Sequence, residues 1–258
     1  MEIESIDDVI YLDFAKAFDI VDHGILMKKF INILVGGCML NWLHNFLAYL
    51  KILTILGQIS FLFFVADINE DLSFCHAASF ADDTRVVCKI ESQNDFNILQ
   101  NDLNKIYTWA KVNNMQFNGA KFEHLRYGTS DNGLKELFTS CYMSPELECI
   151  KVSSDVKDLG VILSSSANFE THVETRAKKG KILAGWIFRT FATRDVEPML
   201  VIYKSLLLPI LEYSCQVWTP TKLGLIRTLE AVQRNFTGKL SQLRLLGEIG
   251  EIVFFGEA

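Results

Sequence analysis

Residues 79–87, "SFADDTRVV", place two aspartates side by side at Asp82 and Asp83. Apolar residues enter and leave this stretch, a pattern that predicts a β-hairpin with the aspartates at its tip. Two adjacent carboxylates repel each other, and the pKa of one should rise unless a cation lies between them. Taken alone, the pair is typical of a solvated turn, where Asp is common. A metal site here therefore requires a carboxylate from elsewhere in the chain.

A third carboxylate, Asp13, ends an apolar run. Residues 8–14, "DVIYLDF", are typical of a buried strand. If that strand lies beside the hairpin, Asp13 meets Asp82, and the carboxylates repel strongly unless divalent cations bind. Mg²⁺ suits such a site because it prefers a few carboxylate oxygens together with waters and phosphates. The alternative is three unrelated aspartates, one at a strand end and two in a turn.

Composition narrows the class of protein. The 258 residues suffice for one large domain or two small ones, half of them are hydrophobic, and the mean hydropathy is +0.20. No apolar run approaches the ~18 residues that a membrane span needs, and the acidic N-terminus has no apolar signal region. We therefore expect an intracellular protein, nuclear or cytoplasmic, without a membrane partner. The six scattered cysteines favour buried thiols over disulfides or zinc.

Several local patterns predict elements. Ser92 and Asp95 form a capping box before a long amphipathic helix. "MQFNGAK" and "EHLRYG" predict a strand pair joined at Asn118 and Gly119. The polar stretch 128–133 is the best candidate for a domain boundary. Strand-like pieces follow it, helical patterns dominate from Phe169 onward, and Pro209 should kink or split one of these helices.

The segment 175–194, "TRAKKGKILAGWIFRTFATR", is basic and holds no acidic residue, although the whole chain carries a net charge of −6. Two aromatic residues, Trp186 and Phe191, are interleaved with the charges. This contrast favours a nucleic-acid-binding face as strongly as an ordinary solvated face. The residues that would contact phosphates are Arg176, Lys178, Lys179, Lys181, Arg189 and Arg194.

In order along the chain, several segments resemble the reverse transcriptases of non-LTR retrotransposons, the jockey and LINE-like group. "VIYLDFAKAFDIVDHGILMKKF" resembles motif A and "FADDTRVV" resembles motif C. "LQNDLNKIYTWAKVNNMQFNGAKFEHLRYG" is similar to the following helix and motif D, and "VKDLGVIL" to the strand pair near the primer grip. Helical stretches up to residue 240 resemble the thumb side. The ordered series covers nearly all of residues 8–240.

The resemblance implies roles for the carboxylates. Asp13 and Asp82 match the ligands of two catalytic Mg²⁺ ions, and the carbonyl of Phe14 would be an additional ligand. Asp83 matches a carboxylate that shapes the site more than it binds. Two such ions about 3.5–4 Å apart can activate an attacking hydroxyl and stabilise a leaving pyrophosphate.

Two further residues take roles from the resemblance. Phe18 matches an aromatic gate that would collide with the 2′-hydroxyl of a ribonucleotide, although it also fits an ordinary helix core position. Lys121 matches the motif D lysine, which would donate a proton or charge to the leaving pyrophosphate. The alternative for Lys121 is a solvated turn lysine.

The implied fold is α+β: a reverse-transcriptase palm-like antiparallel sheet with packed helices, followed by a mostly helical thumb-like domain. We expect a partial palm at 1–127, connecting strands near the primer-grip position at 128–167 and the thumb-like region at 168–258. The implied function is RNA-directed DNA polymerase, with an RNA template, a DNA primer and deoxynucleoside triphosphates. The rival functions are a non-catalytic nucleic-acid-binding remnant and a helical interaction module. The sequence leaves the oligomeric state open.

Two departures from the family pattern predict a truncated, inactive copy. The chain starts 12 positions before Asp13, so we expect the fingers region to be absent. "ILGQISFLFFVADINEDL" resembles only the tail of motif B, and we expect the proline-glutamine-glycine turn of that motif to be lost between Leu50 and Ile55. Because phosphoryl transfer depends mostly on positioning, this loss should cost orders of magnitude in rate. We also expect exposed apolar surface at Phe61 to Phe64, which favours aggregation.

Overall fold

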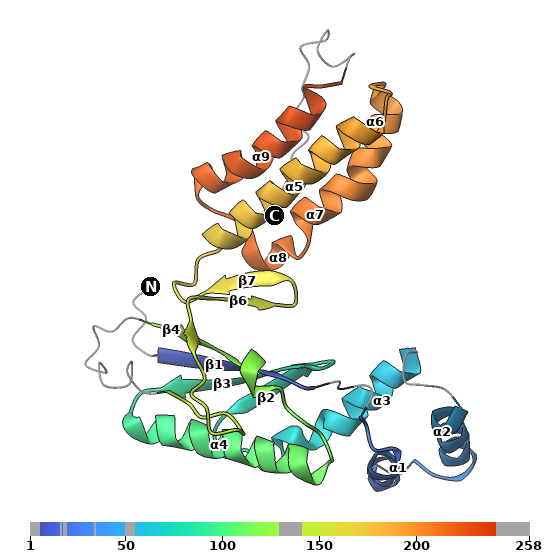
Figure 1. Ribbon diagram of the computed structural model, residues 1–258, viewed down its shortest axis with the longest axis vertical. Coiled ribbons are helices and arrows are strands. Elements are labelled where there is room, and N and C mark those ends of the chain that lie inside the picture. The colour runs from blue at the N-terminus through green and yellow to red at the C-terminus, as the bar shows by residue number, and fades with distance from the viewer. Residues whose placement is uncertain are drawn as a thin grey trace. The chain divides into compact units, whose positions relative to one another are not determined.

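The computed structural model describes residues 6–15, 17, 20–33, 35–49, 55–128 and 141–240. The protein has an α+β fold, and its chain divides into two compact units, Met1–Ser154 and Asp155–Ala258 (Figure 1). The division falls within the expected connecting segment 128–167, whereas residues 129–133 of the polar stretch lie outside the described residues. Each unit is described by itself below.

The first unit combines a sheet with four helices among its described residues. Its strands are β1 (Ile6–Asp13), β2 (His76–Phe80), β3 (Asp83–Ile90), β4 (Glu123–Tyr127) and β5 (Val152–Ser153). Its helices are α1 (His23–Asn32), α2 (Gly37–Tyr49), α3 (Ile55–Val65) and α4 (Gln93–Val112), with 3₁₀ turns η1 (Ala66–Asn69) and η2 (Gly119–Lys121).

The five strands lie in the order β2-β3-β1-β4-β5. The pairs β2–β3, β3–β1 and β1–β4 are antiparallel, but β5 pairs with β4 in parallel. The expected antiparallel sheet is therefore mixed. Among the described residues between these strands, an isolated bridge joins Met143 to Cys149, and no hairpin connects β4 directly to β5. Helix α4 lies along one face of the sheet (Figure 1).

Alternation along the central strands builds the core of the first unit. Every second residue of β1 and β3 points to the face that α4 covers, as the two-residue period of a strand requires. The fully buried side chains of this core include Ile10, Val86, Leu99, Leu103 and Ile106. The predicted capping box at the start of α4 is confirmed, because the Ser92 hydroxyl accepts the Asp95 N–H and the Asp95 carboxylate accepts the Ser92 N–H.

The second unit consists of a hairpin and helices. The hairpin strands are β6 (Asp155–Asp158) and β7 (Val161–Ser164), and the helices are α5 (Glu170–Thr190), α6 (Val196–Ile202), α7 (Leu208–Glu212), α8 (Cys215–Trp218) and α9 (Leu223–Thr237). A π-helical turn, η4 (Tyr203–Leu207), precedes α7. Pro209 lies in the first turn of α7, where its missing N–H interrupts the helical ladder, as predicted. The core of the second unit is built around Ile187, Trp218 and Phe236.

The expectation of unpaired thiols is wrong for two cysteines. Cys141 and Cys149 form a disulfide, with their Cα atoms 5.7 Å apart. A tight loop brings them together, because Ile150 donates its N–H to the Tyr142 carbonyl at 2.7 Å. Spacing alone carries no signal for such a loop.

The predicted strand at "EHLRYG" is confirmed as β4, but the hairpin that should join it to "MQFNGAK" is not formed. Phe117 forms an isolated bridge with Phe14, and the chain then turns through η2 into β4, which pairs with β1. The Asn118 N–H donates to the Asp13 carbonyl at 2.9 Å. The residues just before Asn118 therefore pair with the residues at the end of β1, and they form no hairpin with β4.

Helix α3 carries the apolar segment that was expected to be exposed. Phe61 and Phe64 are buried in the core, which contradicts that expectation, whereas Leu62 and Phe63 are exposed. The helical period explains the split, because positions 61 and 64 share one face and positions 62 and 63 lie on others. Among the helices that the structure describes, none is both long and apolar enough to span a membrane.

Candidate active site

The sheet brings the sequence-predicted carboxylates to one edge. Asp13, the last residue of β1, pairs directly with Asp83, the first residue of β3. Directly paired residues project from the same face, with Cβ atoms about 4.5–5.5 Å apart. Asp13 is partly exposed and Asp83 is exposed, so both carboxylates lie near solvent. The strand register thus answers what the sequence left open: the end of β1 lies beside the hairpin.

Asp82 occupies the tip of that hairpin. Phe80 pairs with Asp83, which leaves Ala81 and Asp82 as a two-residue turn. Such turns favour positive φ, and Ala81 has a φ of 54°. The turn therefore places Asp82 next to Asp83, at the end of the sheet that also holds Asp13.

Lys121 is brought to the same edge. Its Nζ lies 3.0 Å from Oδ2 of Asp13, and its side chain is 63% exposed. Two backbone hydrogen bonds position the turn that carries it: Asn118 N–H to the Asp13 carbonyl at 2.9 Å and Ala15 N–H to the Gln116 carbonyl at 2.8 Å. In this structure the ammonium group partly neutralises the Asp13 carboxylate. An exposed pair of this kind stabilises the fold by only ~0–1 kcal/mol.

Phe14 contributes its side chain to packing. The ring is buried and stacks on Phe117, with centroids 4.5 Å apart, and meets Phe61 edge to face at 6.2 Å. This stack fixes the end of β1 against the segment that leads to Lys121. Phe18, the expected aromatic gate, lies outside the described residues.

The donor set at this edge suits a hard cation. Asp13, Asp82 and Asp83 supply carboxylate oxygens, and Mg²⁺ is commonly held by one or two carboxylates together with waters and substrate phosphates. In the part of the chain that the structure describes, no group of three or more His, Cys, Asp or Glu side chains is arranged so that it could hold a metal ion by itself. A Mg²⁺ ion at this edge would therefore depend on waters and substrate phosphates for part of its coordination.

In the second unit, four of the predicted basic residues are exposed on α5: Lys178, Lys179, Lys181 and Arg189. The helical period places Ile182 and Trp186 among them, and these side chains are 62% and 47% exposed. An exposed indole between cations can stack on a base while the cations meet phosphates. The buried face of the same helix, which includes Val173 and Ile187, joins the core.

The other two basic residues bind the protein's own backbone. Arg176 donates to the Gly160 carbonyl at 2.7 Å, and its guanidinium lies over the Tyr213 ring. Arg194 lies beyond the end of α5 and donates to the carbonyls of Phe188 and Thr193, each at 2.7 Å. A phosphate contact by either arginine would have to replace these bonds.

One polar cluster was missed in the sequence. Asp8, fully buried on β1, accepts hydrogen bonds from Arg126 at 2.7 and 2.8 Å and from the Tyr142 hydroxyl at 2.7 Å, and His124 Nε2 lies 3.0 Å away. Burial alone would raise the pKa of Asp8, but the bonds from Arg126 and the proximity of His124 lower it to about 2. The sequence held one sign of this cluster, because Asp8 is an acidic residue on the buried side of an apolar strand.

Comparisons with known proteins give one relative that has a functional name. No family model matches the chain. A probable RNA-directed DNA polymerase from transposon X-element of Drosophila melanogaster is 23% identical over 253 residues, covering 88% of this chain and 27% of that protein. An uncharacterized protein of Caenorhabditis elegans is 25% identical over 93 residues, covering 36% of this chain and 47% of that protein.

Among solved structures, telomerase from Candida albicans with a fragment of telomeric RNA matches at a TM-score of 0.42 and 10% identity, covering 96% of this chain and 50% of that chain. A likeness at that level carries no argument about function. The chain spans about a quarter of the length of the transposon polymerase, 27%. Over most of its own length, the chain is similar to part of a transposon RNA-directed DNA polymerase.

Proposed function

We propose that the first unit carries the carboxylate site of an RNA-directed DNA polymerase of the non-LTR retrotransposon type, which extends a DNA primer with deoxynucleoside triphosphates along an RNA template. The observation that carries this proposal is the strand register that pairs Asp13 with Asp83 and leaves Asp82 at the adjoining turn. The similarity to a transposon polymerase along most of the chain supports it.

Each residue at this edge has a role in the proposal. Asp13 and Asp82 would hold two Mg²⁺ ions together with the carbonyl of Phe14, and Asp83 would shape the site. The ions, when bound, supply a more acidic attacking hydroxyl and a counter-charge for the leaving pyrophosphate. Lys121 reaches the same edge and would hold a proton or positive charge near that leaving group.

The exposed face of α5 would meet the phosphates of the template and primer. Lys178, Lys179, Lys181 and Arg189 supply the charge, and Trp186 supplies a stacking surface. This face also favours the second candidate function, a nucleic-acid-binding remnant without catalysis. The two candidates differ in whether the carboxylate edge binds metal ions.

A metal titration tests the carboxylate edge directly. We expect Mn²⁺, followed by electron paramagnetic resonance, to bind the unsubstituted chain and to bind Asp13→Asn at least tenfold more weakly, because one ligand charge is lost. Asp71→Asn removes an exposed carboxylate of the same unit outside the site, and it should leave the affinity unchanged. Equal affinities for the Asp13 and Asp71 variants would refute the metal site.

Primer extension tests catalysis. Asp13 and Asp82 are 69 positions apart, and the intervening segment lacks the proline-glutamine-glycine turn that would seat the template and the sugar. Because this chemistry depends on alignment, we expect no incorporation on a poly(A)–oligo(dT) template above that of Asp82→Asn. Incorporation clearly above this control, with Mg²⁺ or Mn²⁺, would instead show a working minimal polymerase.

A further inference from the structure

Strand β2, which leads into the aspartate turn, has little in its own sequence to fix its register. It reads His-Ala-Ala-Ser-Phe, lies at the edge of the sheet, and buries only Ala77. Register is weakly specified where a strand offers few buried side chains. A slip of one residue against β3 would move the two-residue turn and carry Asp82 away from the end of β1.

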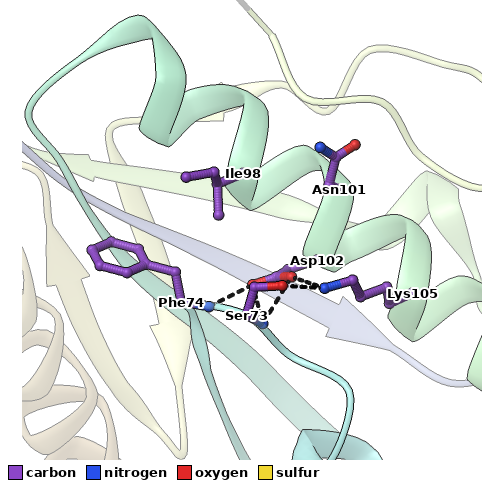
Figure 2. A pocket seen from close by; sticks show the side chains of 6 residues that line it. All are labelled: Ser73, Phe74, Ile98, Asn101, Asp102 and Lys105. Atoms are coloured by element: carbon purple, nitrogen blue, oxygen red, sulfur yellow. Dashed lines mark hydrogen bonds and ion pairs between the residues drawn. The ribbon is translucent and has the colours of Figure 1, made fainter.

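A buried carboxylate on α4 holds the segment that enters β2. Asp102 accepts the backbone N–H groups of Ser73, Phe74 and Cys75 at 3.1–3.2 Å, and Lys105 Nζ lies 2.9 Å from its Oδ1 (Figure 2). Asp102 is fully buried. Burial alone would raise its pKa, but the bonds from Lys105 and from the three backbone N–H groups lower it to about 2. The carboxylate is therefore charged, and its backbone donors are three consecutive residues just before β2.

A second side chain holds the outer edge of β2. Asn69, in η1, accepts the Ala77 N–H and donates to the Ala77 carbonyl, each at 2.8 Å. These are the two bonds that a neighbouring strand would make. Asn69 can make both bonds to Ala77 only in the observed register. Shifting β2 by one position would turn the N–H and the carbonyl of Ala77 toward β3.

We propose that Asp102 and Asn69 are positioning residues that set the register of β2 against β3 and thereby place Asp82 beside Asp13. The register itself does not depend on the proposed polymerase function, whereas its consequence for metal binding does. Neither residue touches the carboxylate edge. They act through the backbone of Ser73–Cys75 and of Ala77.

The cavity beside Asp102 offers a competing role, as a ligand site. It has a volume of about 550 Å³ and is lined by Ser73, Phe74, Ile98, Asn101, Asp102 and Lys105. The oxygens of Asp102 are already bonded to the loop and to Lys105, and Figure 2 shows Asn101 pointing away from them. The geometry therefore favours an anchor for the chain over a site for a ligand.

Amide hydrogen exchange followed by NMR tests the proposal on the full chain. Asp102→Asn keeps the shape but replaces one acceptor oxygen with a donor that faces the loop N–H groups. We expect exchange in β2 and at its partners in β3 to accelerate at least tenfold, while the β1–β4 amides keep their protection. Asp95→Asn is the matched control on the same helix, because it should affect only the capping box.

Asn69→Ala gives an independent variant that should fold, because Asn69 is exposed. It should loosen β2 as Asp102→Asn does. Its matched control is Asn101→Ala, another exposed asparagine, which lines the cavity and, among the described residues, makes no hydrogen bond to β2. If β2 exchange is unchanged in both test variants, or if all strands lose protection equally, the register proposal fails.

Line broadening by Mn²⁺ provides the functional readout. In the unsubstituted chain we expect broadening of the amides at Ala81–Asp83, and at least tenfold more Mn²⁺ should be needed in Asp102→Asn and Asn69→Ala. If Mn²⁺ leaves the turn of the unsubstituted chain unaffected, the proposed metal site is wrong, and the exchange data still decide the register proposal. If β2 loosens and Mn²⁺ affinity is unchanged, Asp102 and Asn69 do not position Asp82.

Discussion

Lys121 and Asp13 form an ion pair at the edge where the sequence predicts metal binding. A divalent cation at Asp13 must compete with this ammonium group. The competition is weak, because the lysine is 63% exposed and such pairs contribute ~0–1 kcal/mol.

We predict that Lys121→Met raises Mn²⁺ affinity by up to about fivefold, since the competing charge is removed. Isothermal titration calorimetry measures the change. Lys89→Met removes another exposed lysine that pairs with a carboxylate, Glu91, and serves as the control. An unchanged or lower affinity in Lys121→Met would mean that the lysine does not compete for Asp13.

The buried pair of Asp8 and Arg126 predicts a large effect on stability. Arg126→Met leaves the Asp8 carboxylate buried without its main partner, so we expect a loss of about 3–5 kcal/mol in the free energy of unfolding. Urea denaturation measures it. Asp8→Asn combined with Arg126→Met should recover part of the loss, because no buried charge then remains. Equal losses in the single and double variants would show that the charge is not the cause.

Acid should weaken the first unit through the same carboxylate. The pKa of Asp8 is about 2 in the fold, below its ordinary 3.8, so the unfolded chain binds more protons between these values. The stabilisation is therefore complete above about pH 5 and is lost as the pH falls through 3.8 toward 2. Urea denaturation at several pH values should show this fall, and Asp8→Asn should reduce it.

At the scale of elements, α5 and β7 meet through His172. Its Nδ1 accepts the Ile162 N–H at 3.0 Å, and its ring lies 4.9 Å from that of Trp218. Burial, with the charges of Arg176 and Lys179, lowers the pKa of His172 to about 4. The imidazole is thus neutral at pH 7, and protonating it would break the contact between the helix and the hairpin.

We predict that the second unit loses stability as the pH falls from about 6.5 toward 4. The folded pKa lies below the ordinary value of 6.5, so the unfolded chain binds the extra proton in this window. The loss should be about 2–3 kcal/mol, followed by the fluorescence of the buried Trp218 during urea denaturation. His172→Gln should flatten the dependence, whereas His23→Gln, at an exposed histidine, should retain it.

At the scale of the whole molecule, the chain carries a net charge of −6 while one face of α5 is basic. Because the chain as a whole repels phosphates, we expect nucleic acid to bind at this basic face of α5. Replacing Lys178, Lys179 and Lys181 with glutamine should weaken binding to an RNA–DNA hybrid and lower the slope of log affinity against log salt by up to about 3. Fluorescence anisotropy at several salt concentrations measures both.

The control for this experiment replaces three exposed lysines of the first unit, Lys28, Lys111 and Lys151, with glutamine. It makes the same change in net charge and should leave the salt slope closer to that of the unsubstituted chain. Binding that ignores salt, or equal losses in both triple variants, would contradict a phosphate-binding face on α5.

Local signals in the sequence were sufficient for features whose causes are local. The apolar run before Asp13, the turn at Asp82 and the capping box at Ser92 each depend on neighbouring residues, and the structure has them where they were predicted. The hairpin predicted at Asn118 failed, because the residues before it pair with the distant end of β1.

Only the tertiary structure decided which distant residues meet. The pairing of Asp13 with Asp83, the approach of Lys121 to Asp13 and the inward turn of Arg176 all depend on strand order and helix packing. Asp102 shows the reason most clearly. In sequence it is one of several polar residues on a helix, and its hydrogen bonds to a loop 27–29 residues away exist only after α4 has packed on the sheet. Periodicity determines which face of an element is buried, whereas the partner that covers this face is selected by the fold as a whole.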